Sequence, residues 1–271
     1  MAARTLVIRT REHAGTMLAE PEDVERGWED ARSALVICDL WDATQCIAAA
    51  RRAALLAPRI DAIASTLRRG GALIVHAPGG CMDFYEGTPA RARAVNAPRS
   101  ESPAPIDWNS WNCDHHAELP RSLTDPGPCS CDAPEPCCTG GPPYPWKRQA
   151  AAIDIAADDA VTDDGQELFN LLAERRIEDV IVVGVHTNIC VLGRPYGIRQ
   201  LLFCGRKPLL CRDLTDSYHR DPHGHSWGTE QTVAHIERYW CSTVTSDQFV
   251  GGAPFSVDRE YRLSQPNEEA P

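Results

Sequence analysis

Lysine is the scarcest of the charged residues in this chain. Only Lys147 and Lys207 occur in 271 residues, and arginine supplies the rest of the 27 basic side chains. Because there are 38 acidic residues, the formal net charge is −11. Such a surplus of negative charge argues against nucleic acid or an anionic membrane surface as a partner. The scarcity of lysine also leaves few candidates for any role that needs an amine.

Long apolar runs are missing as well. No stretch of about 18 consecutive apolar residues occurs, so we expect no membrane-spanning helix. The N-terminal residues carry several charges around the short run Leu6-Val7-Ile8, unlike a secretory signal. We therefore expect a cytoplasmic protein whose partner is a small molecule. A length of 271 residues suits one large domain or two small ones, and a hydrophobic content of 43% is ample for a core.

Cysteine, by contrast, is abundant. Twelve cysteines are many for a cytoplasmic protein. Five of them crowd into one Pro-rich stretch with the spacing C-x15-C-x-C-x5-C-C: Cys113, Cys129, Cys131, Cys137 and Cys138. No pair has the C-x2-C spacing that is typical of a zinc ribbon. Two interpretations stay open, a structural zinc site and a loop of thiols.

The order of apolar segments predicts the fold class. Short β-branched runs alternate with helical patterns, which is typical of a doubly wound, mainly parallel α/β sheet with helices on both faces. The sequence predicts six strands, at residues 34–39, 72–76, 151–155, 180–185, 208–211 and 243–245. Helices are expected at residues 48–69, from 165, at 188–203 and at 229–240.

The domain organisation follows from the segments that break this rhythm. Residues 1–33 form a polar N-terminal extension with one short strand at residues 6–9, and residues 258–271 form a polar tail. Residues 34–257 make up the main domain. Within it, residues 77–146 form a Pro- and Cys-rich insertion that is too long for a plain connection. We expect this insertion to fold over the site as a lid.

One segment carries the strongest chemical signal. The apolar run Ile181-Val182-Val183 ends at Gly184, and a short polar turn then leads to Cys190 at an expected helix start. Backbone N–H groups and the helix dipole at such a place favour a thiolate and can hold an oxyanion. Asp39 ends another apolar strand. Because parallel strands end at the same edge of a sheet, we expect Asp39 and Cys190 to lie close together.

These residues resemble the isochorismatase-like cysteine hydrolases, a family that includes nicotinamidases, N-carbamoylsarcosine amidases and biuret hydrolases. The matching motifs are Val36-Ile37-Cys38-Asp39-Leu40 and the Gly-Val-x-Thr-x-x-Cys segment from Gly184 to Cys190, within a resemblance over residues 33–249. The resemblance implies that Cys190 is the nucleophile and Asp39 the base. It also implies a cis peptide between Val185 and His186, oxyanion donors at the backbone N–H groups of His186 and Cys190, and assembly into a homo-oligomer.

The third member of the family's catalytic triad is a lysine. A compact alignment places it near Ala157, where the chain has none. A longer connection places it at Lys147, with Arg148 as the substitute, whereas Lys207 comes after the cysteine. We therefore predict Lys147 as the triad cation.

Five residues near the expected strand ends are candidates to line a substrate pocket: Trp41, His76, Tyr85, His186 and Asn188. The segment His76-Ala77-Pro78 lacks the Asp that nicotinamidases use to hold a metal, so we expect no catalytic metal and no required cofactor.

The sequence thus predicts a cysteine hydrolase that cleaves a C–N bond of a small amide, ureido or carbamoyl compound through a thioester. The alternative is a non-catalytic or metal-binding protein of the same fold with a Cys-rich interaction loop. Hydrolases of the isochorismatase ether type are disfavoured because they have Gly where this chain has Cys190.

Overall fold

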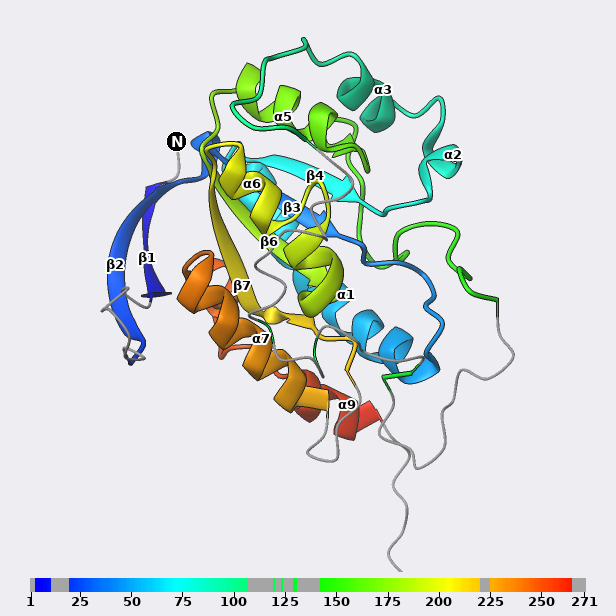
Figure 1. Ribbon diagram of the computed structural model, residues 1–271, viewed down its shortest axis with the longest axis vertical. Coiled ribbons are helices and arrows are strands. Elements are labelled where there is room, and N and C mark those ends of the chain that lie inside the picture. The colour runs from blue at the N-terminus through cyan, green and yellow to red at the C-terminus, as the bar shows by residue number, and fades with distance from the viewer. Residues whose placement is uncertain are drawn as a thin grey trace, which may run out of the picture.

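A single large sheet organises the chain (Figure 1). The computed structural model describes residues 3–10, 20–106, 119, 123, 129–130, 142–219 and 225–264. Within these residues the sheet has eight strands in the order β2 (Glu22–Glu29), β1 (Ala3–Thr10), β8 (Thr243–Val244), β7 (Lys207–Asp216), β6 (Asp179–Val185), β3 (Ser33–Cys38), β4 (Leu73–Ala77) and β5 (Ala160–Val161).

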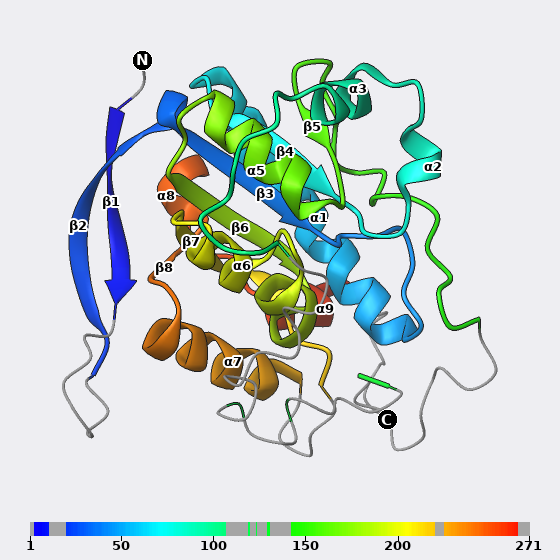
Figure 2. The ribbon, with the colours of Figure 1, turned by 45° about the horizontal axis from the view of Figure 1, so that its top comes forward.

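The run of strands from β8 to β5 is parallel throughout. Two apolar clusters cover its two faces, as in a doubly wound fold. One face packs against α1 (Ile47–Arg69), α8 (Asp247–Val250) and α9 (Val257–Ser264). The other packs against α3 (Pro89–Val95), α5 (Gly165–Glu174), α6 (Ile198–Phe203) and α7 (His225–Tyr239). Figure 2 shows α5, α6 and α7 in front of the sheet. The predicted fold class is confirmed.

The two remaining strands come from the N-terminal extension. β1 and β2 form an antiparallel pair, and β1 joins the sheet through Arg9 opposite Thr243. Leu6 and Ile8 are buried while Val7 between them is 42% exposed, which is the alternation of a strand covered on one side. The sequence predicted one short strand in this extension, whereas the structure has two strands of eight residues each.

Three other predicted elements differ in the structure. Residues 151–155 form a turn followed by irregular chain, and the strand beside β4 is Ala160–Val161 instead. The helix expected at residues 188–203 is broken, because the π-helical turn η4 (Thr187–Val191) ends before Pro195 and α6 begins only at Ile198. A proline has no N–H to donate to a continuing helix. The polar tail begins as α9.

A glycine is required where the ends of β3 and β6 pair. Cys38 pairs with Gly184 in register, and a Cβ at Gly184 would overlap the Cys38 carbonyl. Gly184 also has a φ of +110°, which glycine adopts readily. The glycine thus lets the residue after β3 and the turn after β6 meet at one edge of the sheet.

None of the helices in the described part of the chain is long and apolar enough to span a membrane. Short α2 (Met82–Tyr85) and α3 follow β4 at the start of the predicted insertion. The predicted lid over the site falls largely on residues 107–141, most of which lie outside the described residues.

Candidate active site

Asp39 lies at the carboxyl end of β3, fully buried, in a left-handed backbone conformation with φ +47°. Its Oδ1 accepts a hydrogen bond from the Gly79 N–H at 2.7 Å and one from the Tyr196 hydroxyl at 2.7 Å. Its Oδ2 accepts one from Arg194 Nε at 2.9 Å. Three donors on one buried carboxylate fix its position and compensate for its lost hydration.

Cys190 lies on η4, directly after β6, and is 5% exposed. The Asp39 carboxylate and the backbone N–H of His186 both lie near its sulfur and shift the pKa of the thiol in opposite directions. The peptide bond between Val185 and His186 is cis, as the resemblance implied. The structure therefore brings together Asp39, Cys190 and the turn that begins at His186.

The charge environment favours a protonated Cys190 at rest. Burial raises the pKa of the Cys190 thiol, and the negative charge of Asp39 raises it further. The positive charge of Arg194 and the His186 N–H lower this pKa, but by less. The resting pair is a thiol beside a carboxylate, so a step that uses the sulfur as a nucleophile must first move its proton to Asp39.

Arg194 and Tyr196 are the site residues that sequence reasoning missed. Both follow Cys190 in the stretch where a helix was expected to continue. Burial alone would lower the pKa of Arg194, yet the adjacent charge of Asp39 raises it overall, so the guanidinium is a permanent cation. Burial and Asp39 raise the pKa of Tyr196, which keeps its hydroxyl as a donor.

Gly79 also helps to position the Asp39 carboxylate. A Cβ at this position would lie 2.8 Å from Asp39 Oδ1 and closer still to the Tyr196 hydroxyl. Only a residue without a side chain lets the β4–α2 loop bring its N–H against Asp39. Arg194 Nη2 would lie 3.4 Å from the same Cβ, so the whole cluster closes around this glycine.

Lys147 and Arg148 do not contact Asp39. Both side chains are exposed, and Arg148 lies over the Phe84 ring at 5.5 Å. The backbone N–H groups of Lys147 and Arg148 instead donate to the Asp42 carboxylate, at 2.9 and 3.4 Å. Burial and nearby carboxylates raise the pKa of Cys81 to about 12, and the charge of Lys147 only opposes this rise. The cation that pairs with Asp39 is Arg194.

Trp41, a predicted pocket residue, lies beside the site loop. It is 6% exposed, and its indole Nε1 donates to the Gly79 carbonyl at 3.0 Å. Trp146 stacks on it with ring centroids 4.2 Å apart. The stacked indoles hold the loop that carries Gly79, so Trp41 supports the position of the Asp39 carboxylate.

His76 and Tyr85 belong to a different buried network. The His76 ring contacts Gln149 Oε1 through Nδ1 and Asp159 Oδ2 through Nε2, each at 3.0 Å. The Tyr85 hydroxyl accepts from the Gln149 N–H at 2.9 Å. These contacts tie β4 to the segment after residue 147, and they do not place either side chain against Cys190.

His186 and Asn188 lie on the turn that leads to Cys190. The Asn188 side chain donates to the Leu123 and Tyr218 carbonyls and accepts from the Tyr218 N–H, so it fixes the turn to the end of β7. The His186 ring is 4% exposed and lies edge-on to Tyr218. Burial, followed by the charge of Arg52, lowers its pKa to about 3, so this imidazole is neutral.

The predicted zinc interpretation is tested only in part. Cys113, Cys131, Cys137 and Cys138 lie outside the described residues. Cys129 is described and buried, with its sulfur 3.6 Å from that of Cys46. No group of three or more His, Cys, Asp or Glu side chains suited to a metal occurs in the described part of the chain.

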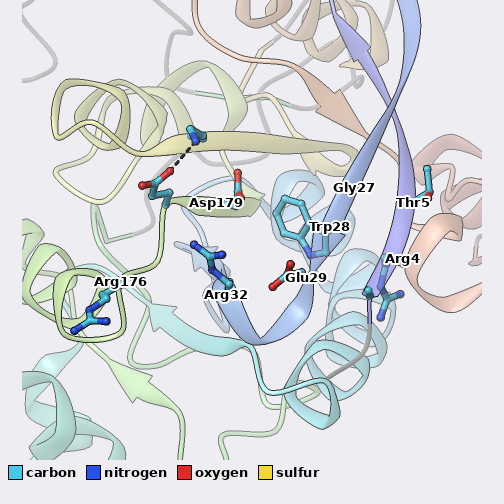
Figure 3. Close-up of a pocket in the computed structure, with 11 residues that line it drawn as sticks. Arg4, Thr5, Gly27, Trp28, Glu29, Arg32, Arg176 and Asp179 are labelled. Carbon is cyan, nitrogen blue, oxygen red and sulfur yellow. Dashed lines mark hydrogen bonds and ion pairs between the residues drawn. The ribbon is translucent and has the colours of Figure 1, made fainter.

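A cavity of about 680 Å³ lies at the opposite end of the sheet (Figure 3). It is bordered by Trp28, Arg32 and Arg176 and by the first residues of β6 and β7, Asp179 and Lys207. Asp39 and Cys190 follow the carboxyl ends of their strands. This cavity is therefore separate from the candidate site.

The fold is similar to those of several solved structures. A cysteine hydrolase from Pseudomonas syringae pv. phaseolicola is 12% identical, with 87% of this chain and 94% of that chain covered and a TM-score of 0.46. An isochorismatase family protein from Burkholderia thailandensis is 15% identical (80% and 93% covered, TM-score 0.46). N-carbamoylsarcosine amidase from Thermoplasma acidophilum is 14% identical (80% and 97% covered, TM-score 0.42). No family model matches the sequence, and no curated protein matches it.

Proposed function

We propose that this protein is a cysteine hydrolase that cleaves a C–N bond of a small amide, ureido or carbamoyl compound. The observation that carries the proposal is the buried Cys190 thiol beside the fully buried Asp39 carboxylate, with Arg194 bound to the same carboxylate. A nucleophile, a base within hydrogen-bond reach and a group that orients the base make up the arrangement needed for covalent catalysis.

The first half of the proposed reaction forms a thioester. Asp39 takes the thiol proton as the Cys190 sulfur attacks the substrate carbonyl carbon and a C–S bond forms. The backbone N–H groups of His186 and Cys190 hold the oxyanion. When the tetrahedral intermediate collapses, the C–N bond breaks and the leaving nitrogen takes the proton from Asp39.

The second half regenerates the thiol. Asp39 accepts a proton from a water molecule, and the resulting hydroxide attacks the thioester carbonyl. The C–S bond then breaks, the acid product leaves, and the Cys190 sulfur recovers its proton from Asp39. Each proton thus moves between Asp39 and one of three atoms: the Cys190 sulfur, the leaving nitrogen, or the oxygen of the water that takes the place of that nitrogen.

We further propose that Arg194 takes the role for which the sequence suggested Lys147. Its charge opposes the rise in the pKa of Cys190, and its Nε orients the Asp39 carboxylate. A hydrogen bond to a charged group contributes about 1.5–3 kcal/mol. Arg194→Gln should therefore lower turnover roughly 10- to 100-fold. Lys147→Ala, the matched control, should leave turnover within about twofold.

Release of ammonia or amine from a panel of small amides, ureas and carbamoyl compounds tests the function itself. The wild-type chain should release it from at least one class, and Cys190→Ala and Asp39→Asn should not. Release that survives Cys190→Ala contradicts the mechanism. No release from any class would favour the non-catalytic alternative of the same fold.

A further inference from the structure

The loop between β4 and α2 makes a tight turn directly beside Asp39. The Cys81 N–H donates to the Pro78 carbonyl at 3.2 Å, which closes a β-turn. Gly80, the third residue of this turn, has a φ of +75°, as expected at that place in a type II turn. Because both central residues are glycines, no side chain opposes a flip of the peptide between them. Other groups therefore have to hold the turn in one form.

Trp41 and Asp163 hold the central peptide of the turn at its two ends. The Gly79 carbonyl accepts a hydrogen bond from the Trp41 indole Nε1 at 3.0 Å. The N–H of the same peptide unit, which belongs to Gly80, donates to Asp163 Oδ2 at 2.9 Å. The carbonyl and the N–H of a trans peptide point in opposite directions, so the two side chains hold it from opposite sides. A flip of this peptide would break both bonds.

The turn carries a second carboxylate on the neighbouring N–H. The Gly79 N–H donates to Asp39 Oδ1 at 2.7 Å, so two consecutive N–H groups bind two different carboxylates. Asp163 lies just before α5, but the N-cap of this helix is Asp164, which accepts from the Glu167 N–H at 2.9 Å. The capping of α5 therefore does not require the Asp163 carboxylate, which is bound to the turn instead.

The site keeps Asp163 at an electrostatic cost. Burial raises the pKa of the Asp163 carboxyl, and the negative charge of Asp39 raises it further. The Gly80 N–H and the positive charge of Arg91 oppose this rise, but by less. The two carboxylates thus lie near each other although their charges repel. A neutral side chain would avoid this repulsion, and what Asp163 contributes in return is its bond to the turn.

We propose that Asp163 is a positioning residue of the candidate site, which locks the turn so that the Gly79 N–H stays on the Asp39 carboxylate. Asp163 acts through the turn and not on the reacting atoms. The Gly79 N–H is one of three donors that orient Asp39, and its loss leaves the carboxylate less well placed to take the thiol proton. The expected effect on turnover rests on the proposed function, whereas the effect on the turn does not.

Amide hydrogen exchange, measured by NMR on the full chain, tests the lock without any substrate. Asp163→Ala removes the acceptor of the Gly80 N–H, so the Gly80 amide should exchange at least about threefold faster. The Gly79 amide should exchange faster by a similar factor, because the released turn no longer holds its N–H against Asp39. Asp163→Asn keeps an acceptor oxygen at the same place and should restore most of the protection of both amides.

Asp61→Ala is the matched control for this experiment. Asp61 lies on α1, and its Oδ1 accepts from the Asp154 N–H at 2.9 Å, which is the same kind of bond at the same length. This variant should speed exchange at Asp154 and leave Gly79 and Gly80 unchanged. Faster exchange at Gly80 with unchanged exchange at Gly79 would overturn the proposal. Exchange in Asp163→Asn that is as fast as in Asp163→Ala would overturn it too.

Steady-state kinetics with an amide, urea or carbamoyl compound that the wild type cleaves then connect the turn to catalysis. Asp163→Ala should lower kcat about tenfold and leave KM within about twofold, because the lost bond orients the base and does not bind substrate. Asp163→Asn should stay within about threefold of the wild type, and Asp61→Ala should match it. An unchanged kcat in Asp163→Ala, or a rise in KM alone, overturns the positioning role.

The two readouts separate this proposal from the proposed function. A wild-type chain that cleaves none of the compounds counts against the proposed function, and the exchange rate of the Gly79 amide then decides on the lock by itself. A chain that is active, but whose Gly79 exchange and kcat are the same in Asp163→Ala, keeps the proposed function and loses the lock.

Discussion

Removing the charge of Asp39 should make Cys190 react faster with an alkylating agent, although it abolishes the proposed catalysis. In the structure burial raises the pKa of the Cys190 thiol, and the neighbouring charge of Asp39 raises it further. Arg194 acts in the opposite direction. The Asp39→Asn variant therefore keeps the cation and loses the anion, whereas Arg194→Gln keeps the anion and loses the cation.

The size of the effect follows from the contact. A full charge at hydrogen-bond range changes the population of an ionised neighbour by roughly tenfold or more. A thiolate of lower pKa is intrinsically less nucleophilic, which cancels about half of this gain on a logarithmic scale. We therefore expect iodoacetamide to label Cys190 at least about threefold faster in Asp39→Asn than in the wild type at the same pH. Arg194→Gln should be slower by a similar factor.

The assay reads the labelling of the Cys190 peptide by mass spectrometry across a range of pH. Cys204 in the same samples controls for general opening of the fold, because it is buried far along the chain from Asp39. Slower labelling in both variants, or unchanged labelling in both, would refute the assigned roles of Asp39 and Arg194 in setting the charge state of the sulfur.

Three further predictions concern the setting of the site and the stability of the fold. Gly79→Ala should abolish turnover and lower the free energy of urea unfolding by about 1–3 kcal/mol, because its Cβ would meet the Asp39 cluster. The control Gly27→Ala, whose Cβ meets nothing within 4 Å, should change this free energy by less than about 0.5 kcal/mol. Equal effects of the two variants would contradict the role of Gly79. The pKa of His186 is lowered from 6.5 to about 3, so between pH 7 and pH 5 only the unfolded chain binds its proton. This linkage lowers the free energy of unfolding by about 2 kcal/mol as the pH falls from 7 to 5. His186→Gln should lose this pH dependence, and an unchanged pH dependence in urea titrations would count against a buried neutral imidazole. The pKa of Asp159 is lowered because hydrogen bonds from His76 and Arg68 outweigh the effect of its burial. The ionised carboxylate therefore stabilises the fold above its usual pKa of 3.8, and this stabilisation is lost as the pH falls further. The destabilisation caused by Asp159→Asn, measured by urea unfolding, should shrink between pH 6 and pH 3.

The central strands and the meeting of Asp39 with Cys190 were predictable from the sequence. Asp39 directly follows an apolar β-branched run, and Cys190 follows the turn after Gly184. Because parallel strands end at the same edge of a sheet, the two residues come together there. The resting state of the thiol was not predictable. A helix start favours a thiolate, but burial and the charge of Asp39 dominate here, and both depend on packing that no local pattern records.

The cation could not be found from spacing because its position depends on a broken helix. Arg194 reaches Asp39 only since the chain turns between η4 and α6. Pro195 inside the expected helix was the one available signal of that break. β2 was missed for a different reason. Its charged residues look like a loop, whereas an edge strand that buries little more than Trp28 tolerates them.

The most direct test of the central claim is an acid-quenched mass spectrum of the protein during turnover of an active amide, urea or carbamoyl compound. We predict a covalent adduct with the mass of the acyl group, mapped to the Cys190 peptide, sensitive to hydroxylamine and absent in Cys190→Ala. Turnover without any adduct under single-turnover conditions, or an adduct on another residue, would contradict Cys190 as the nucleophile.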